Sequence, residues 1–206
     1  MFQIRIHGRG GQGVVTAAEV LSMAAFDGGH HAQAFPSFGS ERMGAPVVAF
    51  CRIDERPIRT REPVMEPDAL IIQDVTLIHQ VDLLAGLAAE AYVLLNTSQS
   101  LDALGLGELS HRFRPDRLCT CPATELALAQ TGRPMPNAAL VAGFAALTGQ
   151  ISLAAVEQAL RQRFSGPTGE RNVAVAVAAY RHVTRSLTPQ DPATRPVPTQ
   201  AHAATD

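Results

Sequence analysis

The 206-residue sequence contains no lysine and no tryptophan, so all 17 of its basic residues are arginine. Without lysine the chain cannot form a Schiff base with a carbonyl substrate or with pyridoxal phosphate, and it has no P-loop lysine. A bound phosphate would have to be met by arginine side chains and backbone amides. The absence of lysine therefore excludes several common catalytic and nucleotide-binding sites.

Cysteine is also scarce. Cys51, Cys119 and Cys121 are too few to ligate an iron–sulfur cluster without another chain. Cys119 and Cys121 alternate along an expected strand, and we interpret them as small buried hydrophobic residues. An odd number of cysteines, with no apparent secretory segment, indicates a reducing cytoplasm. No apolar run approaches the roughly 20 residues of a membrane span, so no membrane-spanning helix is expected.

Charged residues are few, at 17%, whereas 46% of the residues are hydrophobic. A surface with so little charge is expected to be covered in part by partner subunits. The formal net charge of −2 gives no electrostatic reason to expect a nucleic-acid partner. The length suits one large domain with a substantial core.

The most informative stretch is the glycine-rich segment HGRGGQG at residues 7–13. Residues 2–6 alternate apolar with polar side chains, which predicts a strand, and residues 14–26 form an Ala- and Leu-rich run that predicts a buried helix. A strand, a glycine turn and a helix in this order build an anion site, because the free N–H groups of the first helical turn point at the ligand. The spacing G-x-G-x-x-G is met by Gly8, Gly10 and Gly13.

A dinucleotide is the usual ligand of such a loop, but one expected feature is missing. An acidic residue about 20 positions further on normally binds the ribose hydroxyls. The corresponding stretch, residues 30–35, contains no acid, and Asp27 comes too early. An NAD site is therefore disfavoured, whereas another phosphate-bearing ligand stays open. So does the alternative that the glycines serve only a tight turn.

A second loop, residues 36–46, combines turn-forming residues with two serines and an arginine. Hydroxyls and a guanidinium suit the recognition of a phosphate or carboxylate. A solvated turn with a Glu41–Arg42 ion pair remains the alternative.

The remaining pattern alternates strands with helices, which predicts an α/β fold with parallel strands and right-handed crossovers. We expect a three-layer α/β/α domain over residues 1–187 with a mostly parallel sheet, an added hairpin and C-terminal helices. Residues 188–206 contain four prolines and no apolar period, which predicts a disordered tail. The expected hairpin joins a strand at 47–53, through a turn at 54–57, to a short strand beginning at Ile58. Further strands are expected at 69–74, 91–96 and 116–121, and helices at 75–87, 123–131, 137–148, 152–164 and, after a linker at 165–169, to about 187.

Three stretches resemble a known family. They are HGRGGQGVVTAAEVLSMAAF at 7–26, AQAFPSFGSERMGAPVVAFCRI at 32–53 and PNAALVAGFAALTGQISLAAVEQALRQRF at 136–164. All three are similar to the gamma subunit, or equivalent domain, of the 2-oxoacid:acceptor oxidoreductases, of which pyruvate:ferredoxin oxidoreductase is the best known. The resemblance spans residues 2 to about 187.

The resemblance implies a function that the residues alone do not give. Enzymes of this family use thiamine diphosphate with Mg²⁺ to decarboxylate a 2-oxoacid oxidatively. Electrons leave through iron–sulfur (4Fe-4S) clusters to ferredoxin or another acceptor, and the acyl group passes to coenzyme A. The thiamine diphosphate and clusters are expected on partner subunits of the alpha, beta and delta types, so this chain is expected to be inactive alone.

The resemblance further implies that the gamma-type domain forms part of the coenzyme A site. Carried onto this sequence, the second loop could instead contact the thiamine-binding subunit. A nucleotide-binding subunit and a purely structural scaffold subunit of a redox complex remain alternatives. The candidate coenzyme A residues are Gly8, Arg9, Gly10, Gly11, Gln12 and Gly13 in the first loop, with Ser37, Gly39, Ser40 and Arg42 in the second.

Overall fold

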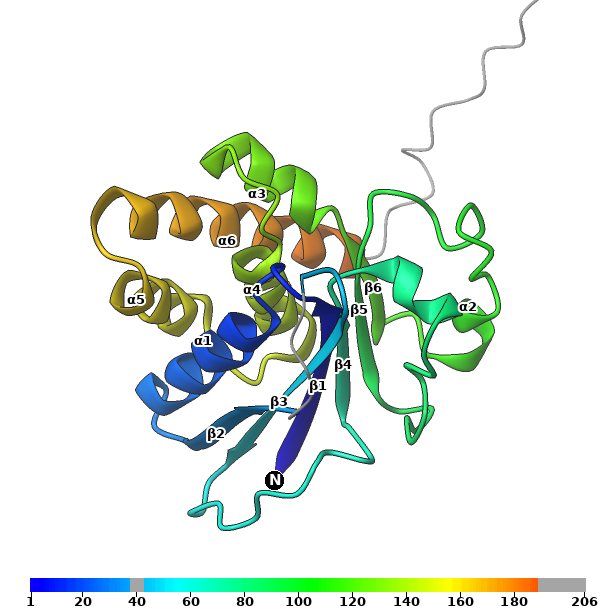
Figure 1. Ribbon diagram of the computed structural model, residues 1–206, viewed down its shortest axis with the longest axis horizontal. Coiled ribbons are helices and arrows are strands. Elements are labelled where there is room, and N and C mark those ends of the chain that lie inside the picture. The colour runs from blue at the N-terminus through cyan, green and yellow to red at the C-terminus, as the bar shows by residue number, and fades with distance from the viewer. Residues whose placement is uncertain (38–42, 189–206) are drawn as a thin grey trace, which may run out of the picture.

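The computed structural model describes residues 1–37 and 43–188. Six strands form one mixed sheet in the order β2-β3-β1-β4-β5-β6 (Figure 1). Strands β1, β4, β5 and β6 run parallel, and β3 runs antiparallel to its neighbours β1 and β2. The expected α/β fold with a mostly parallel sheet is confirmed. The strands are β1 (Phe2–Arg9), β2 (His31–Pro36), β3 (Pro46–Asp54), β4 (Ala69–Ile72), β5 (Tyr92–Asn96) and β6 (Leu118–Cys121).

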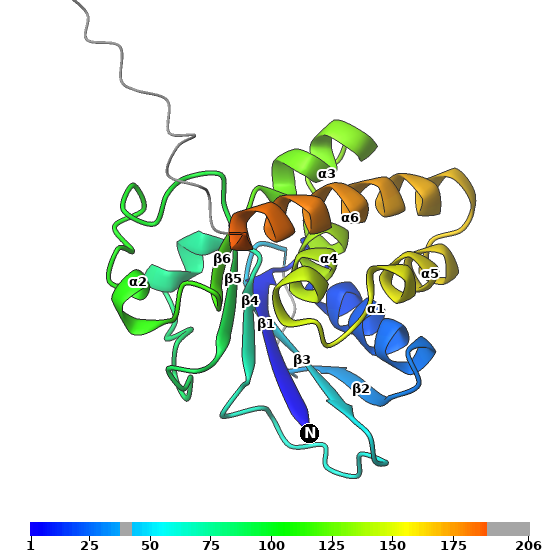
Figure 2. The ribbon, with the colours of Figure 1, turned by 180° about the vertical axis from the view of Figure 1, so that it is seen from behind.

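Five of the helices gather on one face of the sheet, as both views show (Figures 1 and 2). Their apolar sides meet strand residues such as Ile4, Ile71 and Leu94 in the larger of two buried clusters. Helix α4 is buried on nearly all sides, as expected of a helix that is apolar all round. These helices are α1 (Val14–Asp27), α3 (Ala123–Thr131), α4 (Asn137–Thr148), α5 (Leu153–Arg163) and α6 (Gly166–Leu187).

The opposite face is covered differently. Over β4 and β5 lies a smaller buried cluster, to which Leu77, Leu109 and Phe113 contribute from the connecting segments. Those segments contain only a short 3-10 helix, η1 (Val75–His79), and a short helix, α2 (Leu109–Arg112). In the described part of the chain, long helices therefore layer one face, and loops with single helical turns layer the other.

The expected hairpin is wrong, because its second strand, predicted to begin at Ile58, does not form. Residues 55–60 form no strand, and β3 pairs instead with β2, which precedes it in the chain. Both edges of β3 are taken, one by β1 and one by β2, so no edge is left for a strand at Ile58. Because β3 is antiparallel to β1, its first residues lie beside the end of β1.

The expected helix at 75–87 is also wrong beyond its first turns, since only η1 forms. Arg5, from β1, donates through Nη2 to the carbonyl oxygens of Leu83 (2.9 Å) and Ala85 (2.6 Å). A continuous helix to residue 87 would use the Leu83 carbonyl for its own backbone bond, whereas the Ala85 carbonyl would be free in the last turn. A buried arginine 78 residues away in sequence thus takes an acceptor that the helix needs.

Three smaller outcomes concern the C-terminal region. The expected linker at 165–169 is mostly the first turn of α6, which begins at Gly166. Ser152 caps α5 as predicted, accepting a hydrogen bond from the Ala155 N–H at 3.1 Å. Nearly all of the expected tail, residues 189–206, lies outside the described residues. Within the described ranges, no helix combines the length and apolar character needed to cross a membrane.

Gly86 provides a test of how tightly the loop layer is packed. Its φ is +72°, and an added Cβ would collide with the Met65 carbonyl oxygen. Gly105 has nearly the same φ, +70°, but no atom within 4 Å of the Cβ position. We expect Gly86→Ala to lower the free energy of unfolding by about 1–3 kcal/mol more than Gly105→Ala, measured by urea denaturation. Equal losses in the two variants would show that the backbone relieves the collision without cost.

Candidate functional site

The glycine-rich loop lies at the edge of the sheet where β1 ends, beside the end of the parallel strand β4. Strand β1 continues through Arg9, so the turn itself is confined to residues 10–13. Gly11 and Gly13 have φ values of +93° and +76°, a region that L side chains rarely adopt. Gly13 is the N-cap of α1. The sequence-predicted strand, turn and helix are therefore all present.

The side chains of the loop bind one another and the Asp74 carboxylate. Arg9 donates from Nε to Asp74 Oδ2 (3.0 Å), from Nη2 to Thr76 Oγ1 (2.8 Å) and from Nη1 to the Gly44 carbonyl (3.0 Å). Gln12 donates to Asp74 Oδ2 (3.0 Å) and accepts from the Arg9 N–H (2.8 Å). All three guanidinium nitrogens of Arg9 are thus engaged within the protein. Arg9 and Gln12 hold the loop in shape.

The Asp74 carboxylate is ionised at neutral pH. Burial would raise its pKa, but hydrogen bonds from Thr76 and Gln12, together with the Arg9 charge, outweigh burial and hold the pKa below its usual range. One carboxylate can accept four hydrogen bonds, and Asp74 accepts from Arg9, Gln12 and twice from Thr76.

The amino end of α1 remains open to a ligand. Its first turn has no acidic residue and no side-chain cap. No hydrogen bond among the described residues uses the N–H groups of Val14, Val15 or Thr16. These donors and the helix dipole favour an anion at this place. They border a cavity of about 270 Å³ lined by Arg9, Gly10, Gly11, Gly13, Val14, Val15, Thr16, Val47 and Met135.

The end of the second loop meets the glycine loop. Gly10 donates to the Ala45 carbonyl (2.9 Å) and accepts from the Gly44 N–H (3.1 Å). Met43 beside them is 86% exposed. Ser37, directly after β2, donates from its N–H to the Val48 carbonyl (2.8 Å). The candidates Gly39, Ser40 and Arg42 lie outside the described residues.

The sequence patterns did not single out Met135 and Asn137 as parts of this site. Asn137 begins α4, and its Nδ2 lies so close to Gly13 that a Cβ on that glycine would be 2.7 Å away. Met135 lines the cavity beside α1. An Asn at the start of a predicted helix was the available signal, but nothing local placed that helix against residue 13.

Two buried polar side chains lie on the strands that carry the site. Gln73, directly after β4, is 1% exposed, and neither its Oε1 nor its Nε2 has a partner among the described residues. His7 on β1 is 7% exposed, and its Nε2 also has no hydrogen-bond partner among the described residues. Burial, with a smaller contribution from the charge of Arg5, lowers the pKa of His7 to about 4. His7 is therefore neutral at physiological pH.

Comparison with known proteins decides the family. A family model described as pyruvate ferredoxin/flavodoxin oxidoreductase matches residues 3–182. The chain belongs to this family. It is 44% identical over 180 residues to the pyruvate/ketoisovalerate oxidoreductases common subunit gamma of Pyrococcus abyssi, covering 87% of this chain and 96% of the relative. It is also 44% identical to pyruvate synthase subunit PorC of Methanocaldococcus jannaschii, covering 90% and 98%.

Solved structures agree with the assignment as a gamma subunit. Pyruvate oxidoreductase subunit PORC of Thermotoga maritima is similar with a TM-score of 0.75 and 30% identity, covering 87% of this chain and 95% of that one. The 2-oxoglutarate:ferredoxin oxidoreductase of Magnetococcus marinus shares the fold, with a TM-score of 0.68 and 17% identity, over 93% of this chain and 32% of that one. The resemblance inferred from the sequence is confirmed: this chain is a gamma subunit of a multi-subunit 2-oxoacid oxidoreductase.

The buried His7 of this gamma subunit predicts a loss of stability in mild acid. Because its pKa is about 4 in the folded chain and about 6.5 when unfolded, the unfolded state takes up the proton first as the pH falls. Stability is therefore lost between pH 6.5 and pH 4, by about 3 kcal/mol at the lower end. We expect the free energy of unfolding of His7→Gln, measured by denaturant titration, to fall less over this range than that of the unaltered chain.

The exposed His111 supplies the control for this measurement. His111→Gln should follow the unaltered chain over the same pH range. If His7→Gln also follows it, His7 does not titrate differently in the folded and unfolded states.

Proposed function

We propose that this gamma subunit binds the pyrophosphate of coenzyme A in a thiamine-dependent enzyme that converts a 2-oxoacid to an acyl-CoA. The observation that carries the proposal is the open first turn of α1, which follows a glycine turn fixed by internal hydrogen bonds. A pyrophosphate is a compact dianion at neutral pH, and it suits several converging N–H donors at a helix N-terminus.

Within this proposal the residues of the loop have different roles. The glycines at 10, 11 and 13 allow the backbone to approach the phosphate groups, and Val14, Val15 and Thr16 offer N–H donors. Arg9 and Gln12 act as positioning residues, since their side chains bind Asp74 and the loop itself. Coenzyme A binding by Ser37, Gly39, Ser40 and Arg42 remains part of the proposal.

The rest of the chemistry is assigned to other chains. Among the residues that the structure describes, no group of three or more His, Cys, Asp and Glu side chains could hold a metal ion. We assign thiamine diphosphate, Mg²⁺ and the 4Fe-4S clusters to alpha, beta and delta-type partner subunits, and the electrons to ferredoxin or a similar acceptor, in a cytoplasmic complex. One protein of the same fold has been solved with 2-oxoglutarate, coenzyme A and succinyl-CoA bound.

Thr16 allows the anion site to be tested separately from stability. Its side chain lines the cavity in the first turn of α1. An aspartate there is favourable to the helix by about 0.3–1 kcal/mol, but it repels a phosphate. We expect Thr16→Asp in the assembled enzyme to raise the KM for coenzyme A at least about tenfold, the equivalent of 1.4 kcal/mol, without lowering the melting temperature.

Thr16→Asn is the matched control, because it has nearly the same shape without the charge. Reduction of an electron acceptor by the 2-oxoacid in the absence of coenzyme A should be equal in both variants and in the unaltered enzyme. An unchanged KM in Thr16→Asp would identify the glycine loop as a structural turn. Loss of the reaction without coenzyme A would instead place the loop at the thiamine site.

The isolated chain should have no visible absorbance and no turnover with any 2-oxoacid. Its three cysteines are buried and free, and burial raises the pKa of the Cys51 and Cys121 thiols to about 12 and that of Cys119 to about 11. Cluster ligands must be thiolates, so these thiols are poorly suited to the role. A stoichiometric iron signal in the purified single chain would contradict the assignment of clusters to partners.

A further inference from the structure

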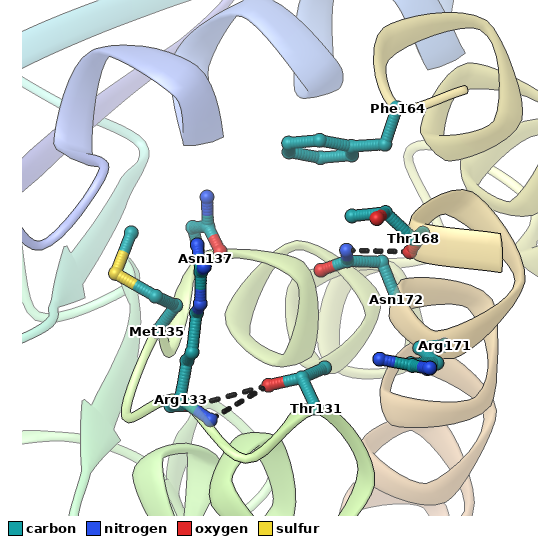
Figure 3. Close-up of a pocket in the computed structure, with 8 residues that line it drawn as sticks. All are labelled: Thr131, Arg133, Met135, Asn137, Phe164, Thr168, Arg171 and Asn172. Atoms are coloured by element: carbon teal, nitrogen blue, oxygen red, sulfur yellow. Dashed lines mark hydrogen bonds between the residues drawn. The ribbon is translucent and has the colours of Figure 1, made fainter. Parts of the chain in front are cut away.

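A second cavity, of about 240 Å³, lies between the turn that joins α3 to α4 and the start of α6 (Figure 3). Arg133 and Arg171 reach it from these two elements, and Phe164 forms part of its wall. The cavity lies outside the glycine loop, and no step described so far uses it.

The cavity is electropositive. Both arginines are exposed, and among the described residues neither guanidinium has an ion pair or hydrogen bond, whereas nearby Arg161 binds Glu157 and Glu170. No Asp or Glu lines the cavity. Helices α4 and α6 both begin at it, with no acidic residue in either first turn. Two helix dipoles and two unneutralised guanidinium groups therefore favour an anion there.

Asn137 supplies an independent sign of a ligand. It lines the cavity and is only 4% exposed, yet its Nδ2 has no acceptor among the described residues, while its Oδ1 accepts from the Ala138 N–H at 2.9 Å. Its Nδ2 atom still has accessible surface, so a ligand or water can accept the hydrogen bond that no described residue accepts. Asn137 thus adds an amide donor from a largely buried side chain to the two charges of the cavity.

The two cavities adjoin. Met135 lines both of them, and Asn137 of the second cavity lies against Gly13 of the first. Figure 3 shows Asn137 between the start of α1 and Arg133. The two cavities therefore share a wall at Met135 and Asn137.

We propose that the second cavity binds the 3′-phosphate of the same coenzyme A molecule, with Arg133 and Arg171 as the charged contacts and Asn137 as an amide donor. This inference rests on the proposed function of the glycine loop. In coenzyme A one ribose carries the pyrophosphate at its 5′ position and the other phosphate at its 3′ position. The two binding sites must therefore be separated by no more than about the width of one ribose. The shared Met135 meets that requirement, and the Phe164 ring offers an apolar surface to the adenine.

Comparison of coenzyme A with dephospho-coenzyme A tests the inference, since the two differ only in the 3′-phosphate. Equilibrium dissociation constants for both ligands would be measured by calorimetry on the assembled enzyme. We expect Arg133→Ala and Arg171→Ala each to weaken coenzyme A binding about tenfold or more, as for the loss of a charge-assisted bond. Binding of dephospho-coenzyme A should change less than about twofold, the equivalent of 0.4 kcal/mol.

Arg181→Ala is the matched control, because it removes the same charge from an exposed position on α6 that does not line the cavity. It should leave both dissociation constants unchanged. If the two cavity variants weaken neither ligand, or weaken both ligands equally, the assignment to the 3′-phosphate is overturned.

A different result would contradict the proposal that the glycine loop binds the pyrophosphate. Thr16→Asp should weaken coenzyme A and dephospho-coenzyme A to the same extent, because both carry the pyrophosphate. An effect of Thr16→Asp on both ligands, without a 3′-phosphate-dependent effect of the arginine variants, would remove this inference alone. The absence of any Thr16→Asp effect would remove the proposed function.

Discussion

Two parallel strands, β1 and β4, end side by side, and the Asp74 carboxylate joins the segments that follow them. It binds Arg9 and Gln12 of the glycine turn and caps η1 through Thr76. Because the carboxylate is charged and its side chain is only 16% exposed, these bonds are stronger than those between neutral groups. The backbone of the loop is therefore held in one shape by its own side chains, and the N–H groups of the first turn of α1 are left without an acceptor among the described residues.

Local patterns sufficed for the elements around the loop. Alternation at residues 2–6 and an unbroken Ala-rich run at 14–26 predicted β1 and α1, and the Ser152 cap predicted the start of α5. Each of these depends on neighbours within a few residues. The expected helix at 75–87 does not form beyond η1, where Arg5, far away in sequence, takes the Leu83 carbonyl that this helix would need. The expected strand at Ile58 failed because β2 already pairs with β3. Competition between distant segments for one partner is not visible in a local pattern.

The same reason limits what the sequence could say of the site. An arginine beside a glycine turn looks like a phosphate ligand, and only the fold shows that Arg9 donates to Asp74, Thr76 and the Gly44 carbonyl, all distant in sequence. Conversely, Arg133 and Arg171 occupy unremarkable surface positions in the sequence, and the fold brings them to one cavity. A residue type indicates what a side chain can bind, whereas the tertiary structure decides which partner it meets.

The antiparallel direction of β3 has a consequence for communication between subunits. It brings residues 43–45 against the turn, where Gly10 exchanges hydrogen bonds with Gly44 and Ala45. The exposed Met43 and the glycine turn are therefore joined through backbone hydrogen bonds, so a displacement of one segment would be transmitted to the other. If another chain contacts Met43 while an anion binds the first turn of α1, thermodynamic reciprocity requires that each event change the free energy of the other by the same amount.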